Sequence, residues 1–365
     1  MISFTPTEDQ QLLIDTINRY AKNNMRAVAH DADEDSQPPV DVVQTGWEIG
    51  LVPTAIPEDL GGLGDLSAVT GVLAAEELAY GDLSIALHVL APALFAYPII
   101  LYGTEEQKQN LLPMFLEQQL TPATAALLEP GIAFDPNELK TTATVDGDQV
   151  RLNGVKAYVP LAADAPWMLV YARDTETGNI DAYLVEDSVR GVEVERREQL
   201  MGLRALPMYR VRFSDAAVDR ACRLGGEKGC DYTALLNRSR VALAALAVGV
   251  ARGAFEYARD YAKERVQFGA PIATKQAIAF MLAEMAIEVD AARMMAWEAA
   301  WKLDQGEDAT REAYLAKQYA DEAVLFVTDS AVQTLGGHGF IREHPVERWL
   351  RNGRGFTTFD GLAMV

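Results

Sequence analysis

The chain has 365 residues, 49% of them hydrophobic, with 53 acidic against 32 basic side chains and a formal net charge of −21. Such an acidic chain repels phosphate backbones and anionic lipid headgroups, which argues against nucleic-acid or membrane-surface binding. Two cysteines without clustered histidines provide neither a disulfide framework nor a zinc site, so we expect a reduced, cytoplasmic setting and no metal. No basic region precedes an apolar stretch at the N-terminus, so no signal peptide is evident.

Residues 1–120 predict a helical domain. Thr7 stands three residues before Gln10, the spacing of a capping box, and an apolar pattern with helical spacing follows. Residues 84–103 have about the length of a membrane span and no formal charge. They also contain two prolines and lead directly into the polar run TEEQKQ. We therefore expect one or two buried core helices there and no membrane span.

Residues 121–229 have a different pattern, with short runs of alternating apolar and polar residues such as QVRLNGVKAYV and DAYLVE. The turn sequences DGD, NG and ETGN separate these runs and are typical of antiparallel strands. We expect about six to eight strands, arranged as a barrel or a packed pair of sheets. Residues 230–365 return to long helices, whose Met and Ala content is typical of a bundle or an oligomer core.

The most specific sequence patterns lie in the last third of the chain. AKERVQFGAPI occupies residues 262–272, QTLGGHGF residues 333–340 and HPVERWLR residues 344–351. IPEDLGGLG at residues 56–64 and GTEEQKQNLLP at residues 103–113 precede them. In order and spacing these five motifs resemble the acyl-CoA dehydrogenase family. No GxGxxG phosphate loop, Gly-x-Ser-x-Gly elbow or paired-histidine metal motif is present.

The resemblance extends from about Phe4 to Gly361 and implies an α+β fold of three parts. These are an N-terminal all-α domain over residues 1–120, a middle antiparallel β-barrel-like domain over residues 121–229, and a C-terminal four-helix bundle over residues 230–365. It also implies an FAD-dependent oxidoreductase of fatty acid metabolism that acts on an acyl-CoA thioester. Members self-associate or join a paralogous subunit, as homotetramers or heterotetramers, and pass electrons to an electron-transfer flavoprotein.

The resemblance further implies which residues hold the adenosine diphosphate half of FAD across a subunit interface. They are Arg265, Gln267 and Phe268, with Gln333, Gly336 and Gly337 from the neighbouring subunit and Gln276 at the same interface. A planar arginine suits a pyrophosphate, and glycines allow the backbone to approach the cofactor closely. Two other interpretations stay open: a surface ion pair for the arginine, and a helix C-cap and turn for the two glycines.

The family's catalytic base is most often a glutamate in a Tyr-Glu-Gly-Thr sequence, nine residues after an arginine. Here Asp360 follows Arg351 by nine residues and therefore occupies the base position, with Gly361 beside it at the substrate. Aspartate is one methylene shorter, so its carboxylate is expected to fall ~1 Å short, a displacement that can cost roughly a hundredfold in rate. The alternative is a solvated aspartate in a glycine-flanked turn.

Three further departures concern the flavin ring and the ligand. Leu128 replaces a threonine and Phe134 a serine of the family pattern, and Pro160 offers neither a hydroxyl nor an N–H. Tyr158 is still able to stack on the flavin ring. Each lost hydrogen bond removes about 0.5–1.5 kcal/mol if its partner finds no substitute. The adenosine side of the cofactor site therefore resembles the family closely, whereas the redox end is altered.

On the substrate side, the run Asn237–Arg240 is expected just before a long helix, where the family has an arginine near the acyl-CoA. Arg240 is the best match for a contact with a CoA phosphate or with the mouth of the site. The alternative is an arginine near a helix start that holds an acidic neighbour.

Three functions remain open from the sequence. The first is α,β-dehydrogenation of an acyl-CoA with Asp360 as general base. The second is a catalytically impaired partner subunit of a heteromeric acyl-CoA dehydrogenase, suggested by the missing hydroxyls and the short stretch that follows Asp360. The third is a nitroalkane oxidase-like flavoenzyme that uses the aspartate.

Overall fold

A computed structural model describes residues 4–132 and 134–365, and its N-terminal third is helical. The helices are α1 (Glu8–Tyr20), a π-helical turn (Ala21–Met25), α2 (Arg26–Asp35), α3 (Val40–Trp47), α4 (Leu51–Ala55), α5 (Ala68–Gly81), α6 (Leu83–Leu90), α7 (Ala93–Tyr102) and α8 (Glu105–Leu111). The predicted capping box at the start of α1 is confirmed. The Thr7 hydroxyl accepts the Gln10 amide at 3.2 Å, and the Gln10 side-chain oxygen accepts the Thr7 amide at 3.0 Å.

In the part of the chain that the structure describes, two helical stretches are long and apolar enough to cross a membrane, Leu83–Tyr102 and Tyr232–Glu264. In the first, 89% of the most apolar window is buried within the fold, and in the second 78%. The first is divided into α6 and α7. The prediction of buried core helices there is confirmed.

The middle of the chain forms a seven-stranded sheet. Its strands are β1 (Thr124–Ala126), β2 (Thr142–Asp146), β3 (Gln149–Pro160), β4 (Trp167–Asp174), β5 (Ile180–Glu186), β6 (Val192–Arg197) and β7 (Met208–Asp219). The order is β1-β4-β2-β3-β7-β6, with β5 on the other edge of β4. The hairpins are antiparallel as predicted, but β1 and β2 both pair with β4 in parallel, so the sheet is mixed. Turn chemistry specifies pairing between successive strands only, and these two pairings are non-local.

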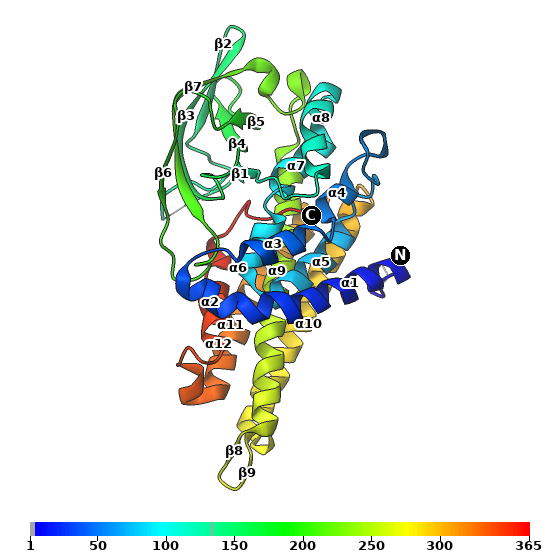
Figure 1. Cartoon of the computed structure of the whole chain (residues 1–365), viewed down its shortest axis with the longest axis vertical. Helices are drawn as coiled ribbons and strands as arrows, with labels where there is room; N and C mark the ends of the chain where they lie inside the picture. The colour runs from blue at the N-terminus through cyan, green and yellow to red at the C-terminus, as the bar shows by residue number, and fades with distance from the viewer. Residues whose placement is uncertain (1–3, 133) are drawn as a thin grey trace.

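The C-terminal part consists of long helices and a short hairpin at their tip (Figure 1). The elements are α9 (Tyr232–Glu264), the hairpin β8 (Val266–Gln267) and β9 (Ala270–Pro271), α10 (Gln276–Asp304), α11 (Thr310–Leu335) and α12 (Val346–Gly353). The hairpin projects away from the sheet, at the opposite end of the helices. The predicted order of helices, sheet and helices is confirmed.

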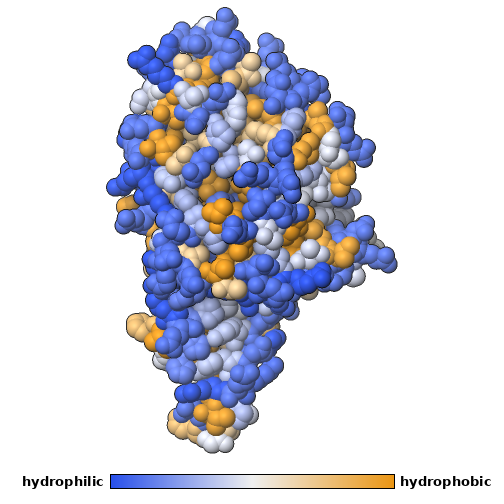
Figure 2. All heavy atoms as spheres, viewed as in Figure 1, coloured by the Kyte–Doolittle hydropathy of each residue, from blue (hydrophilic) through white to orange (hydrophobic). Residues whose placement is uncertain are grey.

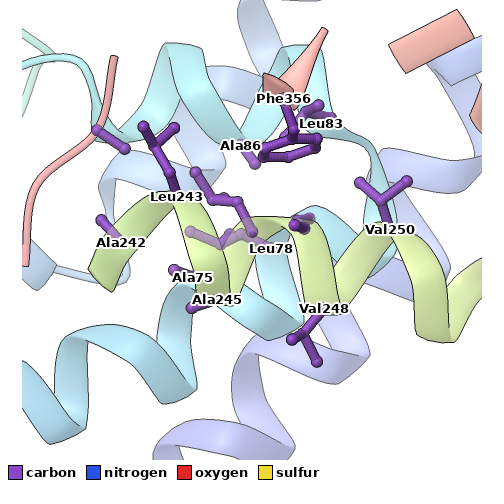
Figure 3. Close-up of a cluster of buried hydrophobic side chains, with 14 of the residues drawn as sticks. Ala75, Leu78, Leu83, Ala86, Ala242, Leu243, Ala245, Val248, Val250 and Phe356 are labelled. Atoms are coloured by element: carbon purple, nitrogen blue, oxygen red, sulfur yellow. The ribbon is translucent and has the colours of Figure 1, made fainter. Parts of the chain in front are cut away.

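The main hydrophobic core lies where α5 and α6 cross α9 (Figure 3). Leu78, Leu83 and Leu243 are almost completely buried in it, together with Phe356 from the C-terminal segment. The crossing is close because α9 carries small residues. A Cβ on Gly249 would stand 2.2 Å from the backbone oxygen of Glu76 on α5. The core therefore fixes the C-terminal segment against the helices that surround it.

Candidate active site

Asp360 follows a 3-10 turn that begins at Phe356, and its side chain is half-buried. Hydrogen bonds hold the backbone on both sides of it. Lys317 on α11 donates its Nζ hydrogen to the backbone oxygen of Phe356 at 2.7 Å. The Gly361 amide donates to Oγ of Ser239 on α9 at 3.0 Å. The carboxyl group is thus fixed where α9, α11 and the C-terminal segment meet.

Gly361 is required at its position for two reasons. Its φ of +65° lies in the left-handed region, and a Cβ would stand 2.7 Å from Cδ2 of Leu127 at the end of β1. The residues after it are buried as well, with Leu362 and Val365 each 3% exposed. A solvated turn near the chain end, the alternative for Asp360, therefore does not describe this segment.

The charges around Asp360 act in opposite directions. Burial raises the pKa of its carboxyl group and Asp135 adds to this rise, whereas Lys317 and Arg240 lower it; the net direction is upward. Burial also raises the pKa of Asp321, the ion-pair partner of Lys317 at 2.5 Å, to about 6. A carboxylate with a raised pKa is a stronger base than a solvated one.

Arg240 lies in the third turn of α9, and the prediction that it precedes this helix is wrong. The helix begins at Tyr232, because the side chain of Asp231 accepts the Ala234 amide at 2.9 Å and so caps it earlier. The Arg240 guanidinium lies 5.5 Å from the centroid of the Tyr314 ring. From this place within the helix, the positive charge of Arg240 lowers the pKa of Asp360. The alternative of an arginine near a helix start is therefore wrong.

At the predicted redox end, Leu128 and Pro160 are buried and Phe134 is half-buried against the core. Tyr158 lies at a β-bulge in β3 with φ of +53°, a conformation that is uncommon for an aromatic residue. Tyr158 and Phe359 both line a cavity of about 160 Å³. An aromatic side chain therefore shares a cavity with the residue before the candidate base, and positions 128 and 160 carry no side-chain hydroxyl.

Sequence reasoning missed a buried ion pair that holds β1 against β3. Lys156 is completely buried, and its Nζ donates to Glu129 at 2.9 Å and to the Leu127 oxygen at 3.0 Å. Burial lowers the pKa of Lys156 to about 8. Glu129 also accepts the amides of Lys140 and Thr141. The pair fixes the end of β1, where Leu127 contacts Gly361, and no local sequence signal indicates it.

At the other end of the helices, one cavity of about 420 Å³ brings together two groups of residues far apart in the sequence (here called the hairpin pocket). Its lining includes Arg265, Gln267, Phe268, Gly336 and Gly337, together with Lys275 and His338. Gln276 and Gln333 are exposed nearby and are not part of the lining. Figure 2 shows apolar surface at the lower tip of the molecule, where Figure 1 places the hairpin.

The backbone makes the hairpin pocket open. Phe268 and Gly269 form the two-residue turn with φ of +53° and +78°, which leaves the Phe268 ring 92% exposed. Gly336 is the C-cap of α11, and a Cβ on it or on Gly337 would meet nothing within 4 Å. Arg265 has no ion-pair partner in the described part of the chain. The glycines are thus a helix cap that also leaves space for a ligand.

Three family models match the chain in succession. Residues 7–119 match the acyl-CoA dehydrogenase N-terminal domain, residues 124–216 the middle domain and residues 228–364 the C-terminal domain.

Individual relatives agree over nearly the whole length. The mitochondrial short-chain specific acyl-CoA dehydrogenase of Bos taurus is 33% identical over 98% of this chain and 88% of its own length. The solved structure of butyryl-CoA dehydrogenase from Megasphaera elsdenii is 30% identical, with a TM-score of 0.89 over 98% of this chain and 96% of that one. A chain of a structure described as the electron transferring flavoprotein of Acidaminococcus fermentans is 31% identical, with a TM-score of 0.89 over 98% and 95% of the two chains.

Proposed function

Because the chain belongs to the acyl-CoA dehydrogenase family of oxidoreductases, we propose that it oxidises the Cα–Cβ bond of an acyl-CoA thioester, with Asp360 as the general base. The placement of Asp360 carries this proposal. Its carboxyl group is half-buried, has a raised pKa and is held between α9 and α11 beside a lysine and an arginine. Burial and neighbouring charge adjust the pKa of a carboxyl group for proton abstraction in this way.

The backbone beside the base offers a second contribution. The Asp360 amide donates to no oxygen within residues 4–132 and 134–365. It is therefore available to the thioester oxygen, on which negative charge develops as the α-proton leaves. Arg240 adds positive charge on the same side. One residue thus supplies the base through its side chain and a polarising donor through its backbone.

The cofactor that the family implies is FAD, which accepts the hydride that leaves the β-carbon. The hairpin pocket fits the pyrophosphate, because Arg265 has no ion-pair partner among the described residues, Lys275 adds charge and the two glycines leave open space. Tyr158 fits the face of the flavin ring. Gly361, next to Asp360, is hydrogen-bonded to Ser239 near the start of α9, whereas Arg265 of the hairpin pocket follows the end of this helix of 33 residues. We therefore infer that each cofactor is shared between two copies of the chain.

An electron-transfer flavoprotein is the proposed electron acceptor, supported by the family assignment and by the similarity to a chain of the Acidaminococcus fermentans structure. The acyl group itself is assigned only as a thioester of coenzyme A, as for the short-chain relative of Bos taurus.

A partner-subunit function is the second candidate, favoured by the buried, hydroxyl-free side chains of Leu128 and Pro160 at the predicted redox end. In that case the chain would retain the dinucleotide contacts but depend on a paralogous subunit for turnover. Full turnover by an oligomer of this chain alone would exclude it.

A nitroalkane oxidase-like reaction predicts instead oxygen consumption with small nitro compounds and no response to acyl-CoA.

The absorbance spectrum of the purified protein tests the proposal directly. We expect a flavin band that bleaches anaerobically when an acyl-CoA of the right chain length is added. The panel should span short, long, branched and aromatic acyl groups, with free coenzyme A as the control. Protein that stays colourless after incubation with FAD would refute the proposal.

A further inference from the structure

His338 forms part of the wall of the hairpin pocket, and neither the sequence motifs nor the proposed reaction gives it a role. It lies in the 3-10 turn Gly336–Gly339 that follows α11, directly after the two glycines. Its side chain is half-buried. The imidazole ring is therefore partly packed against the protein and partly exposed.

A hydroxyl group fixes one nitrogen of this ring. Nδ1 of His338 lies 2.8 Å from the hydroxyl of Tyr261 on α9. Within the described residues Nδ1 of His338 is the hydrogen-bond partner of the Tyr261 hydroxyl, and we assign the hydroxyl as donor because its hydrogen would otherwise have no acceptor. The neutral imidazole then carries its hydrogen on Nε2, the nitrogen on the opposite side of the ring.

A second histidine holds the plane of the first. The rings of His338 and His344 stack with centroids 5.4 Å apart and an interplanar angle of 14°. His344 is itself held by the hydroxyl of Tyr257, 2.7 Å from its Nδ1, and its ring meets that of Tyr261 edge-on. Two tyrosines on α9, one turn apart, thus orient two imidazoles. An orientation fixed in the free protein reduces the entropy lost when a ligand binds.

We propose that His338 donates its Nε2 hydrogen to a phosphate oxygen of the bound dinucleotide. This inference rests on the proposed function, since it takes FAD as the ligand of the hairpin pocket. A pyrophosphate presents several oxygens, and Arg265 and Lys275 are the cations that share the pocket with this ring. Because the chain as a whole carries a net charge of −21 and repels anions, local cations and N–H donors are needed to bind a pyrophosphate.

The test is FAD binding by the full-length chain, titrated by flavin fluorescence. H338F keeps a ring of similar size for the stack on His344 but removes the donor, and we expect it to weaken FAD binding about tenfold. H338Q places an amide N–H near the position of Nε2 and is expected to stay within about threefold of the wild type. R265M serves as the reference for loss of a pocket cation, and H30Q, on the exposed side of α2, as the histidine control.

Each result decides between the proposals. H338F that binds FAD as tightly as the wild type would overturn the role of His338 and leave the proposed function standing. An equal loss in H338Q and H338F would assign the effect to ring packing and also overturn it. Wild-type protein that binds no FAD would overturn the proposed function, and this inference with it.

Melting temperatures measured without FAD, together with the variant Y261F, separate loss of the hydrogen-bond donor from loss of the fold. Y261F removes the hydroxyl that holds Nδ1 of His338 but keeps the aromatic ring that lines the pocket, and we expect it to weaken FAD binding by less than H338F does.

Discussion

At the scale of single residues, Asp360 owes its position to its neighbours. Lys317 anchors the turn before it, and Ser239 anchors the residue after it. The same lysine lowers the pKa that burial raises. The position and the pKa of the Asp360 carboxyl group therefore depend on residues of α9 and α11, which are distant from Asp360 in sequence. The same hydrogen bonds fix the backbone that carries the shorter aspartate side chain.

Replacing the proposed base should stop the reaction without releasing the cofactor. We expect D360N to slow flavin bleaching by an acyl-CoA at least about a hundredfold, because an amide cannot accept the α-proton. D135N is the matched control, since Asp135 is an exposed carboxylate whose charge acts on the same site. Stopped-flow absorbance measures both variants. Equal bleaching rates for D360N and the wild type would assign the base elsewhere.

His88 on α6 makes the stability of the protein depend on pH. Its Nδ1 is buried without a hydrogen-bond partner in the described chain, and burial lowers its pKa to about 4. The unfolded chain binds this proton near pH 6.5, the ordinary value for histidine, whereas the folded chain does not. The contribution of neutral His88 to the free energy of unfolding is therefore fully present above about pH 6.5 and is lost as the pH falls toward 4.

The expected contribution of His88 to this loss is about 3 kcal/mol between pH 7 and pH 4. H88L cannot take up a proton in either state, so its free energy of unfolding should fall less than that of the wild type over this range. Urea denaturation at several pH values measures the difference. Parallel pH profiles for the two proteins would show that His88 is not the titrating group.

At the scale of the helices, a cluster of charges joins α5 to α9 and α10. Arg252 on α9 contacts Glu76 and Glu77 on α5, with three nitrogen–oxygen distances of 2.7 Å. Arg293 on α10 contacts Glu76 from the other side. Both glutamates are buried. A single arginine loss therefore leaves a buried carboxylate without its full compensation.

We expect R252M to lower the free energy of unfolding by about 3–5 kcal/mol, the usual cost of breaking a buried pair from one side. R259M provides the contrast, because Arg259 pairs with Asp260 at the surface, where such pairs contribute about 0–1 kcal/mol. Chemical denaturation of both variants measures the two costs. Similar losses would mean that the buried cluster is no more stabilising than a surface pair.

At the scale of the whole molecule, α10 carries an apolar stripe on its exposed side. Phe280, Ile287 and Met294 recur every seven residues and are 59%, 64% and 53% exposed. Residues with this spacing lie on one face of a helix. The stripe lies on α10, which also borders the hairpin pocket through Ile278. If a second copy of the chain covers this stripe, it also lies next to the pocket, as a cofactor shared between two chains requires.

We expect the wild type to form dimers or tetramers and I287E to dissociate toward monomers, because the interface would have to bury a charge. V40E introduces the same side chain at another exposed apolar position, on α3, and should leave the assembly unchanged. Light scattering after size exclusion gives the masses. An unchanged mass for I287E would place the subunit interface on another face.

Much of the fold was predictable because its signals are local. The capping box at Thr7, the hairpin turns of the sheet and the burial of α6 and α7 all follow from residues near one another in sequence. The start of α9 was predicted wrongly, since Asp231 caps the helix two turns before the arginines that suggested its start. The parallel pairing of β4 with β1 and β2 was also missed, because it joins strands that no turn connects.

The sequence by itself determined the family, the order of helices and strands, and the positions of Asp360, Arg265 and the two glycines, because each depends on residue type and spacing along the chain. The tertiary structure decided which of these residues meet, and what surrounds them. Lys317 and Lys156 lie outside every motif, and His338 lies inside QTLGGHGF without an assigned role. Lys317 nevertheless holds the turn before the base, Lys156 the end of β1, and His338 forms part of the wall of the hairpin pocket. Burial, hydrogen bonds and charge at these places come from segments distant in sequence, and only the folded chain brings them within contact.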